Sequence, residues 1–406
     1  MLKIIGSFAQ LLTMRNLPLA GPLADSQLEV LENVGILSEN GRILEVGDFE
    51  NLVKSHPAAV VERLPAHCVG LPGFVDCHTH ICFAGSRAND FALRNAGKSY
   101  LEIAAAGGGI ADTTQKTRLA TQAELAQSVA QRATRHLLEG VTTTEVKTGY
   151  GLSVNEEIKM LAAIAQAQQH THNELVSTCL AAHIVPQPFA SAMDYLHVVV
   201  AELLPQIKHY CNRVDVFVEQ KAFDATAANW YLGQARALGF ELTVHADQFS
   251  VGGSQVAVQN HALSADHLEA STETEITALA RSQTVAVALP GASLGLGMPF
   301  APARKLLDAG AMLAIASDWN PGSAPMGDLL AQAAILATYE KLTTAEVLAA
   351  ITYRAAKALN KSQIGRLAAG FQADVAVFET ASYQEILYQQ GKLKPKFVYK
   401  KGVLCS

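Results

Sequence analysis

The fold is decided by ten residues, Leu71-Pro72-Gly73-Phe74-Val75-Asp76-Cys77-His78-Thr79-His80. An apolar run that opens with Pro-Gly and ends in two histidines predicts a buried β-strand with both imidazoles at its C-terminal end. Because side chains alternate along a strand, His78 and His80 are expected on the same face. Two imidazoles on one face can bind a zinc or iron ion. The alternative is two structural histidines satisfied by hydrogen bonds, so further ligands must be found elsewhere.

The composition limits the class of protein. A chain of 406 residues, half of them hydrophobic, predicts one large and one smaller domain. A net charge of −6 without a run of Lys and Arg argues against a nucleic-acid or membrane partner. Six cysteines without a C-x-x-C pair predict neither a disulfide framework nor a thiolate zinc cluster, which favours a cytoplasmic protein. Residues 1–14 resemble neither a secretory signal nor a membrane span and are expected to form the first strand.

Both ends of the chain have strand-like patterns. Residues 34–37 and 42–46 flank Asn40-Gly41, a strong hairpin signal, and residues 373–378 and 397–399 are strand-like again. Because neither end is long enough to make a comfortable domain alone, we expect residues 1–66 plus 365–406 to form one small β-sandwich domain.

Residues 67–364 alternate between strands and alanine-rich helices, such as the helix around residues 124–138, which predicts parallel βα units. Beside the strand that ends at His78, strands are expected at residues 141–146, 175–180, 213–218, 242–245, 262–267, 285–289 and 312–317. Eight strands close a (β/α)₈ barrel, a TIM-like fold of the α/β class. Gly107-Gly108-Gly109 predicts either a flexible loop over a site or a structural turn.

Polar residues at the strand ends are the candidates for function, because barrel active sites lie at that face. His245, His267 and Asp318 each follow an apolar strand. Each alone has a simpler explanation, a hydrogen-bonded histidine or a helix-capping aspartate. Their joint order is much less expected by chance: His-x-His on the first strand, one histidine on each of two later strands, and an aspartate on the last.

This set resembles the amidohydrolase superfamily, metal-dependent hydrolases with a (β/α)₈ barrel and a small β-sandwich made from both chain ends. Further motifs carry the resemblance over nearly the whole chain: HTHICFAGSR at 78–87, KTGYG at 147–151, AHIVP at 182–186, HADQF at 245–249, SADHL at 264–268 and SDWNPGS at 317–323. Their combination is similar to the members that open an imidazolone ring.

The resemblance implies one zinc or iron ion per chain, held by His78, His80, His245 and Asp318, with a position left for water. Dinuclear relatives carry a bridging carboxylated lysine at the end of the strand expected at residues 213–218. Glu219 stands there instead, which favours one ion, and we expect it to be a structural hydrogen-bonding carboxylate.

The reaction implied is hydrolysis of the ring amide C–N bond of 4-imidazolone-5-propanoate to N-formimidoyl-L-glutamate, in histidine degradation, with metal-bound water as nucleophile. Asp318 would transfer the proton, while His267 and His183 position and polarise the carbonyl. Arg87 matches the propanoate carboxylate, since guanidinium binds carboxylates as a fork. The other substrate-binding positions implied are Tyr100, Tyr150, His183, Gln248, Asn320, Gly322 and Ser323. Tyr150, between two glycines, is expected to be the most exposed of them.

Gln248 departs from the pattern of many members, which have a glutamate there as a proposed proton-transfer group. Because glutamine cannot act as a general base, the role moves to Asp318 and His267. The remaining histidines, His56, His136, His170, His172 and His209 among them, are expected on the surface.

Two other functions fit the motifs less well. Another mononuclear amidohydrolase, a ring deaminase or cyclic amidase, is disfavoured because deaminases usually need the missing glutamate, and because Arg87 and the 147–151 motif favour a carboxylate-bearing substrate. A non-catalytic scaffold is disfavoured because all four ligands are present. The expected partner is a small anionic substrate, and the sequence leaves the oligomeric state open, a homodimer included.

Overall fold

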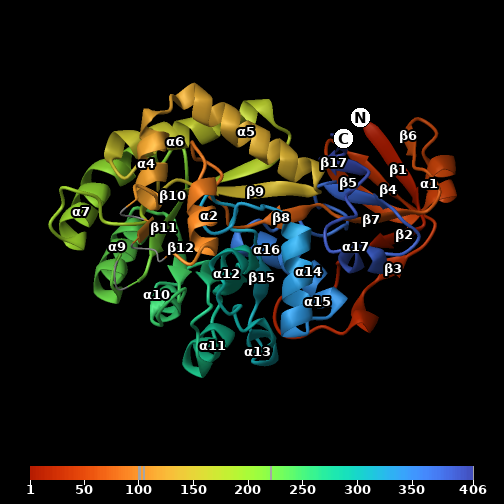
Figure 1. Cartoon of the computed structure of the whole chain (residues 1–406). Helices are drawn as coiled ribbons and strands as arrows, with labels where there is room; N and C mark the ends of the chain where they lie inside the picture. Colours follow the sequence, from red (N-terminus) through yellow and green to blue (C-terminus); the bar gives the residue numbers. More distant parts are fainter. Residues whose placement is uncertain (99–101, 104–105, 220–221, 406) are drawn as a thin grey trace.

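The computed structural model describes residues 1–98, 102–103, 106–219 and 222–405. The chain has two parts, a barrel surrounded by helices and a smaller part built of two sheets, which contains both termini (Figure 1). Tyr100, one of the expected substrate-binding residues, lies outside the described residues.

The barrel is an eight-stranded parallel sheet whose strands neighbour one another in chain order. This confirms the expected α/β barrel. Its strands are β8 (Phe74–Asp76), β9 (Val141–Lys147), β10 (Glu174–Ala182), β11 (Arg213–Phe217), β12 (Glu241–Ala246), β13 (Ser264–His267), β14 (Val285–Ala288) and β15 (Leu313–Ile315).

Helices follow most of these strands and cover the outside of the barrel (Figure 1). They are α2 (Ala88–Asn95), α4 (Ile110–Leu119), α5 (Gln122–Leu138), α6 (Val154–Ala167), α7 (Ala192–Val198), α8 (Leu204–Ile207), α9 (Ala225–Ala237), α10 (Gly253–Gln259), α11 (Glu273–Ala280), α12 (Pro290–Leu296), α13 (Ala303–Asp308), α14 (Leu329–Glu340), α15 (Thr344–Ala350) and α16 (Tyr353–Ala358). Short 3₁₀ turns lie at Asp25–Gln27 and Gln168–His170, and a π-helical turn lies at Val199–Leu203.

Helix α5 shows how the sequence specifies these helices. The Thr121 hydroxyl accepts a hydrogen bond from the backbone N–H of Glu124, whose carboxylate accepts one from the backbone N–H of Thr121. This capping box satisfies two of the N–H groups that a helix start leaves unpaired. Val129, Ala133 and His136 follow on the buried face at helical spacing.

His136 corrects an expectation, since it is fully buried instead of exposed. Its Nε2 lies 3.0 Å from the carbonyl oxygen of Gly327, and its ring packs against Trp319 with the centroids 4.7 Å apart. The sequence contains a signal for this burial, because His136 follows Val129 and Ala133 at helical spacing.

The barrel closes at the C-terminal end of its strands. Strand β8 ends at Asp76, so the strand expected to carry both histidines stops before them. The chain continues extended, and Thr79 forms an isolated parallel bridge with Trp319, beyond the end of β15. The backbone N–H of His80 donates to the Trp319 carbonyl at 2.9 Å, and that of Asp318 donates to the His78 carbonyl at 3.0 Å. The first and last strands therefore meet at the expected site.

The smaller part combines both chain ends, as expected. One sheet has the order β5-β4-β1-β6 and the other β18-β17-β16-β7-β2-β3. The strands are β1 (Leu2–Phe8), β2 (Gln10–Leu12), β3 (Val30–Leu31), β4 (Val34–Glu39), β5 (Arg42–Asp48), β6 (Val60–Arg63), β7 (Cys68–Pro72), β16 (Val375–Glu379), β17 (Phe397–Lys400) and β18 (Val403–Leu404), with helices α1 (Phe49–Ser55) and α17 (Gln384–Tyr388).

One strand pairing joins the two ends of the chain, and another forms the expected hairpin. Strand β7 pairs antiparallel with β16, with Leu71 opposite Ala376. Asn40 and Gly41 connect β4 to β5, both with positive φ, as a tight hairpin turn requires. The domain boundaries at residues 66/67 and 364/365 stay a prediction, although β7 pairs within the smaller part.

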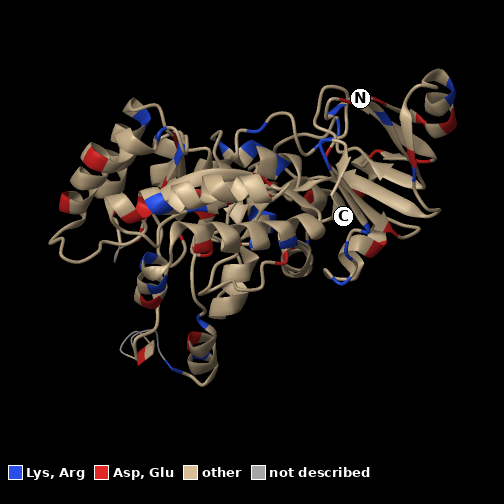
Figure 2. Ribbon diagram, turned by 90° about the horizontal axis from the view of Figure 1, so that it is seen from above, with Lys and Arg blue, Asp and Glu red and all other residues tan. Residues whose placement is uncertain are grey.

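Basic and acidic residues are interspersed along both parts of the molecule (Figure 2). Among the described residues, no helix has the length and apolar character needed to cross a membrane.

Gly73 separates β7 from β8, where the chain leaves the smaller part and enters the barrel. A Cβ at this position would lie 2.5 Å from Cγ2 of the buried Thr142 on β9. The close approach of β9 therefore requires glycine here.

We predict that Gly73→Ala lowers the free energy of unfolding by about 1–3 kcal/mol, because the added methyl overpacks the junction. Gly233→Ala is the matched control, since a Cβ in this part of α9 meets no atom within 4 Å. It should raise stability by about 0.5–1 kcal/mol through helix propensity. Thermal unfolding of both variants measures the difference, and equal shifts would contradict the packing argument.

Candidate active site

A cavity of about 250 Å³ lies at the C-terminal end of the barrel strands. The expected site residues that line it are His80, Arg87, Tyr150, His183, His245, Gln248, His267, Asp318, Asn320, Gly322 and Ser323. His78 lies close behind them and is fully buried. The fold thus gathers residues from many separate strand ends into one place.

Four of these side chains, those of His78, His80, His245 and Asp318, bring ligand atoms close to one another. Nε2 of His80 lies 3.2 Å from Nε2 of both His78 and His245. Oδ1 of Asp318 lies 3.5 Å from Nε2 of His78 and 3.4 Å from that of His80. Ligands 2.0–2.1 Å from a tetrahedral ion lie about 3.3–3.4 Å from one another, so these separations fit a metal ion of the size of zinc.

The chemistry of these donors also fits a cation. Nδ1 of His78 lies 2.7 Å from Oδ2 of Asp266, and Nδ1 of His245 lies 2.9 Å from Oδ2 of Asp215. With the Nδ1 protons directed at carboxylates, the Nε2 lone pairs face inward. Burial lowers the pKa of His78 well below its usual value and that of His245 to about 3, which keeps both rings neutral. Oδ1 of Asp318 is buried without a hydrogen-bond partner among the described residues.

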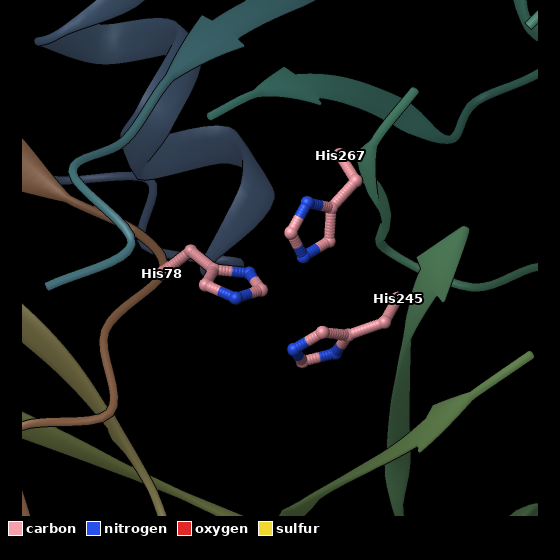
Figure 3. Close-up of side chains that lie close together, drawn as sticks. All are labelled: His78, His245 and His267. Carbon is pink, nitrogen blue, oxygen red and sulfur yellow. The ribbon is translucent and has the colours of Figure 1, made fainter. Parts of the chain in front are cut away.

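His267 lies beside this cluster but has a different environment. The side chains of His78, His245 and His267 point toward one another, with ligand atoms within 4.8 Å (Figure 3). Nδ1 of His267, however, lies 3.5 Å from Oε2 of Glu269. Burial opposes the charged form, but the Glu269 carboxylate prevails and raises the pKa of His267. The Glu269 contact therefore distinguishes His267 from His78 and His245, whose Nδ1 atoms face Asp266 and Asp215.

The turn after β15 holds Asp318. Its Oδ2 accepts hydrogen bonds from the Asn320 amide at 2.8 Å and the Ser323 hydroxyl at 3.4 Å. The Asn320 side-chain oxygen accepts from the backbone N–H groups of Gly322 and Ser323 at 2.7 and 2.8 Å. Asn320 and Ser323, expected to contact substrate, therefore also fix the orientation of Asp318. Burial raises the pKa of Asp318.

Arg87 lies on the cavity wall and is held in place by Asp90. Its Nε donates to Oδ2 of Asp90 at 2.7 Å, and the backbone N–H of Gly109 donates to the same oxygen at 2.9 Å. A Cβ on Gly322 would lie 2.6 Å from Nη1 of Arg87, so a larger residue at 322 would displace the guanidinium from this position. Asp90 and the cavity-lining Arg94 were not predicted from the sequence, because neither follows a strand.

Three further expected residues have informative environments. Nδ1 of His183 lies 3.0 Å from the Gly149 carbonyl oxygen, which must accept, so Nε2 of the neutral ring is an acceptor. Tyr150 corrects an expectation, because only 4% of it is exposed, with its ring 6.2 Å from that of His80. Gln248 is buried and has no hydrogen bond to any described residue.

Glu219 has the structural environment expected of it. Its carboxylate accepts hydrogen bonds from the backbone N–H groups of Phe249 and Ser250 at 3.2 and 3.1 Å. These bonds tie the end of β11 to the loop after β12.

Buried charges beneath the cavity were not predicted. The Lys147 ammonium lies 2.8 Å from Glu145 and 2.7 Å from Asp215, fully buried. It does not line the cavity, so this lysine gives no support to the argument from the 147–151 motif for a carboxylate-bearing substrate. A signal was available, since Asp215 lies between Val214 and Val216 in a predicted strand, and a charge in the interior of a barrel strand needs a partner.

Related sequences align with almost the whole length of this chain. The amidohydrolase family matches residues 252–405. The imidazolonepropionase of Myxococcus xanthus is 44% identical over 370 residues, covering 89% of this chain and 87% of the relative. That of Bdellovibrio bacteriovorus is 39% identical over 387 residues, covering 94% and 90%.

Solved structures share the fold at low sequence identity. An adenosine deaminase from Xanthomonas campestris with bound zinc has a TM-score of 0.69 at 18% identity, covering 99% of this chain and 92% of the deaminase. An atrazine chlorohydrolase from Arthrobacter aurescens complexed with zinc has a TM-score of 0.72 at 16% identity, covering 99% and 94%.

Proposed function

Because this chain belongs to the imidazolonepropionase family of metal-dependent amidohydrolases, which hydrolyse a cyclic amide in histidine degradation, we propose a reaction and the residues that perform it. The reaction is opening of 4-imidazolone-5-propanoate to N-formimidoyl-L-glutamate. One zinc or iron ion per chain would be held by His78, His80, His245 and Asp318.

The observation that carries this proposal is the convergence of three Nε2 atoms and Oδ1 of Asp318 at 3.2–3.5 Å, in a cavity that also contains a guanidinium. The first feature suits a divalent cation and the second suits a carboxylate. A substrate that joins an amide ring to a short carboxylate tail uses both.

Asp318 is the proposed proton carrier. A divalent ion held by these ligands would lower the pKa of a water molecule and polarise a carbonyl group. Oδ1 of Asp318 faces the ligand point, and Oδ2 is oriented by Asn320 and Ser323. A carboxylate fixed in this way can take a proton from water and deliver it to the departing ring nitrogen.

His267 and His183 divide the recognition of the ring between them. The raised pKa of His267 favours an imidazolium, which donates from Nε2 to the carbonyl oxygen as negative charge develops there. His183 directs an acceptor nitrogen at the cavity and is proposed to bind a ring N–H. This role replaces the carbonyl polarisation that the resemblance implied, because an acceptor nitrogen cannot donate to a carbonyl oxygen.

Arg87 is proposed to bind the propanoate tail. Its Nε is engaged by Asp90, which leaves the terminal nitrogens near Gly322 for a carboxylate. Tyr150 and Gln248 supply a hydroxyl and an amide to the same cavity. Tyr100 is proposed as a further contact from the family motif alone.

The first prediction tests the reaction and the ion. Purified protein should contain about one zinc or iron per chain by elemental analysis, and should convert imidazolone propanoate into formimidoylglutamate, followed by loss of ring absorbance and mass spectrometry. His80→Ala should lose both metal and activity, whereas His170→Ala, at an exposed position, should lose neither. Two tightly held ions, or turnover by metal-free protein, would refute the proposed site.

Arg87→Met should raise KM much more than it lowers kcat, because the tail lies away from the bond that breaks. If the pair of the Arg87 guanidinium and the substrate carboxylate is desolvated, the decrease in kcat/KM should correspond to about 2–4 kcal/mol. Arg87→Lys should recover part of it, since the charge remains without the fork. Steady-state kinetics decide, and an unchanged KM in Arg87→Met would place the tail elsewhere.

Gln248→Ala should reduce kcat/KM by about 1–3 kcal/mol while the metal stays bound, because the amide orients substrate or water. Gln248→Glu should stay within about tenfold of the parent, since the carboxylate retains the acceptor and loses the donor. The pH–rate profile is the decisive measurement. A hundredfold acceleration by Gln248→Glu with a new acidic limb would overturn Asp318 as the base.

A further inference from the structure

A buried lysine lies in the barrel interior, beneath the converging ring nitrogens. Nζ of Lys147 lies 2.7 Å from Oδ2 of Asp215, 2.8 Å from Oε1 of Glu145 and 3.9 Å from Oδ2 of Asp266. These residues come from β9, β11 and β13, and alternate strands supply one layer of side chains inside such a barrel. Branched apolar residues usually fill that layer, whereas here one ammonium meets three carboxylates.

Two of these carboxylates also contact the proposed metal ligands. Oδ2 of Asp215 lies between the lysine and Nδ1 of His245, 2.9 Å from the latter. Oδ2 of Asp266 is 2.7 Å from Nδ1 of His78. In each case a single carboxylate oxygen faces both the ammonium and a histidine. A shift of the lysine would therefore move the carboxylates that hold the rings of His245 and His78.

We propose that Lys147 is a positioning residue for the metal site, an inference that rests on the ligand set proposed above. Its ammonium donates a hydrogen bond to Glu145, forms a close ion pair with Asp215 and interacts with the more distant Asp266 through charge. The ammonium draws Asp215 and Asp266 together against their mutual repulsion, and this spacing aims Nε2 of His245 and His78 at one point. Without the ammonium the two carboxylates separate, and the two nitrogens no longer converge.

A purely structural lysine makes a different prediction. Losing a buried cation destabilises any fold, because it leaves carboxylates uncompensated. Only a positioning role also changes the affinity and geometry of the bound ion. Lys400, in strand β17 of the smaller part, provides the matched control. It is buried, and its Nζ lies 2.8 Å from Asp374 and 3.2 Å from Glu174.

The experiment compares Lys147→Met with Lys400→Met. The dissociation constant of Zn²⁺ is measured by competition with a chromophoric chelator, and the Co²⁺-substituted proteins are compared by their absorption spectra. Lys147→Met should bind Zn²⁺ about 10–100-fold more weakly and show an altered Co²⁺ spectrum. Lys400→Met should lose thermal stability but keep the parental affinity and spectrum.

A second variant keeps the test decisive if Lys147→Met folds poorly. Glu145→Gln combined with Lys147→Met removes one charge of each sign and leaves Asp215 and Asp266 in place. It should fold and still bind Zn²⁺ more weakly. Affinity within about twofold of the parent in either Lys147 variant, with an unchanged Co²⁺ spectrum, would overturn the proposal.

His80→Ala separates this failure from failure of the proposed function. If His80→Ala loses Zn²⁺ while the Lys147 variants keep it, only the role of Lys147 is wrong. If His80→Ala binds Zn²⁺ like the parent, the ligand set itself is wrong.

Discussion

Two backbone hydrogen bonds between the segments that follow the first and last barrel strands support the rest of the site. They run from Asp318 N–H to the His78 carbonyl and from His80 N–H to the Trp319 carbonyl. Ser317 N–H adds a third contact, to the buried carboxylate of Asp76 at 3.0 Å. Because these bonds join the segments that carry three of the four proposed ligands, closing the barrel and assembling the metal site are one structural event.

The backbone also turns sharply at or just after the ends of three strands. Asp247, His267 and Asp318 all have positive φ, a conformation that is costly for residues other than glycine. Such strain persists only where surrounding contacts maintain it. Around Asp247 those contacts are the hydroxyls of Ser254 and Ser271, which donate to its carboxylate.

The sequence was most informative where a local pattern determines the position of a side chain. Strand alternation and the polar residues after apolar runs predicted the eight strands and led to His245, His267 and Asp318. The roles of Asp90 and Lys147 were not predicted, because they depend on how helix α2 packs over the cavity and on the register between alternate strands. A periodic pattern in the local sequence does not specify either arrangement. His136 differs from the surface position expected of a helical histidine, because its spacing from Val129 and Ala133 puts it on the buried face of α5.

The pairing of β7 with β16 has a consequence for synthesis of the protein. Strand β7 immediately precedes the first barrel strand, yet its antiparallel partner lies about three hundred residues later in the chain. While the polypeptide emerges from the ribosome, one edge of β7 stays without its native neighbour until the entire barrel has been translated. An unpaired apolar edge can recruit strands from other chains. Until β16 is made, this edge of β7 is therefore a site at which nascent chains can associate wrongly.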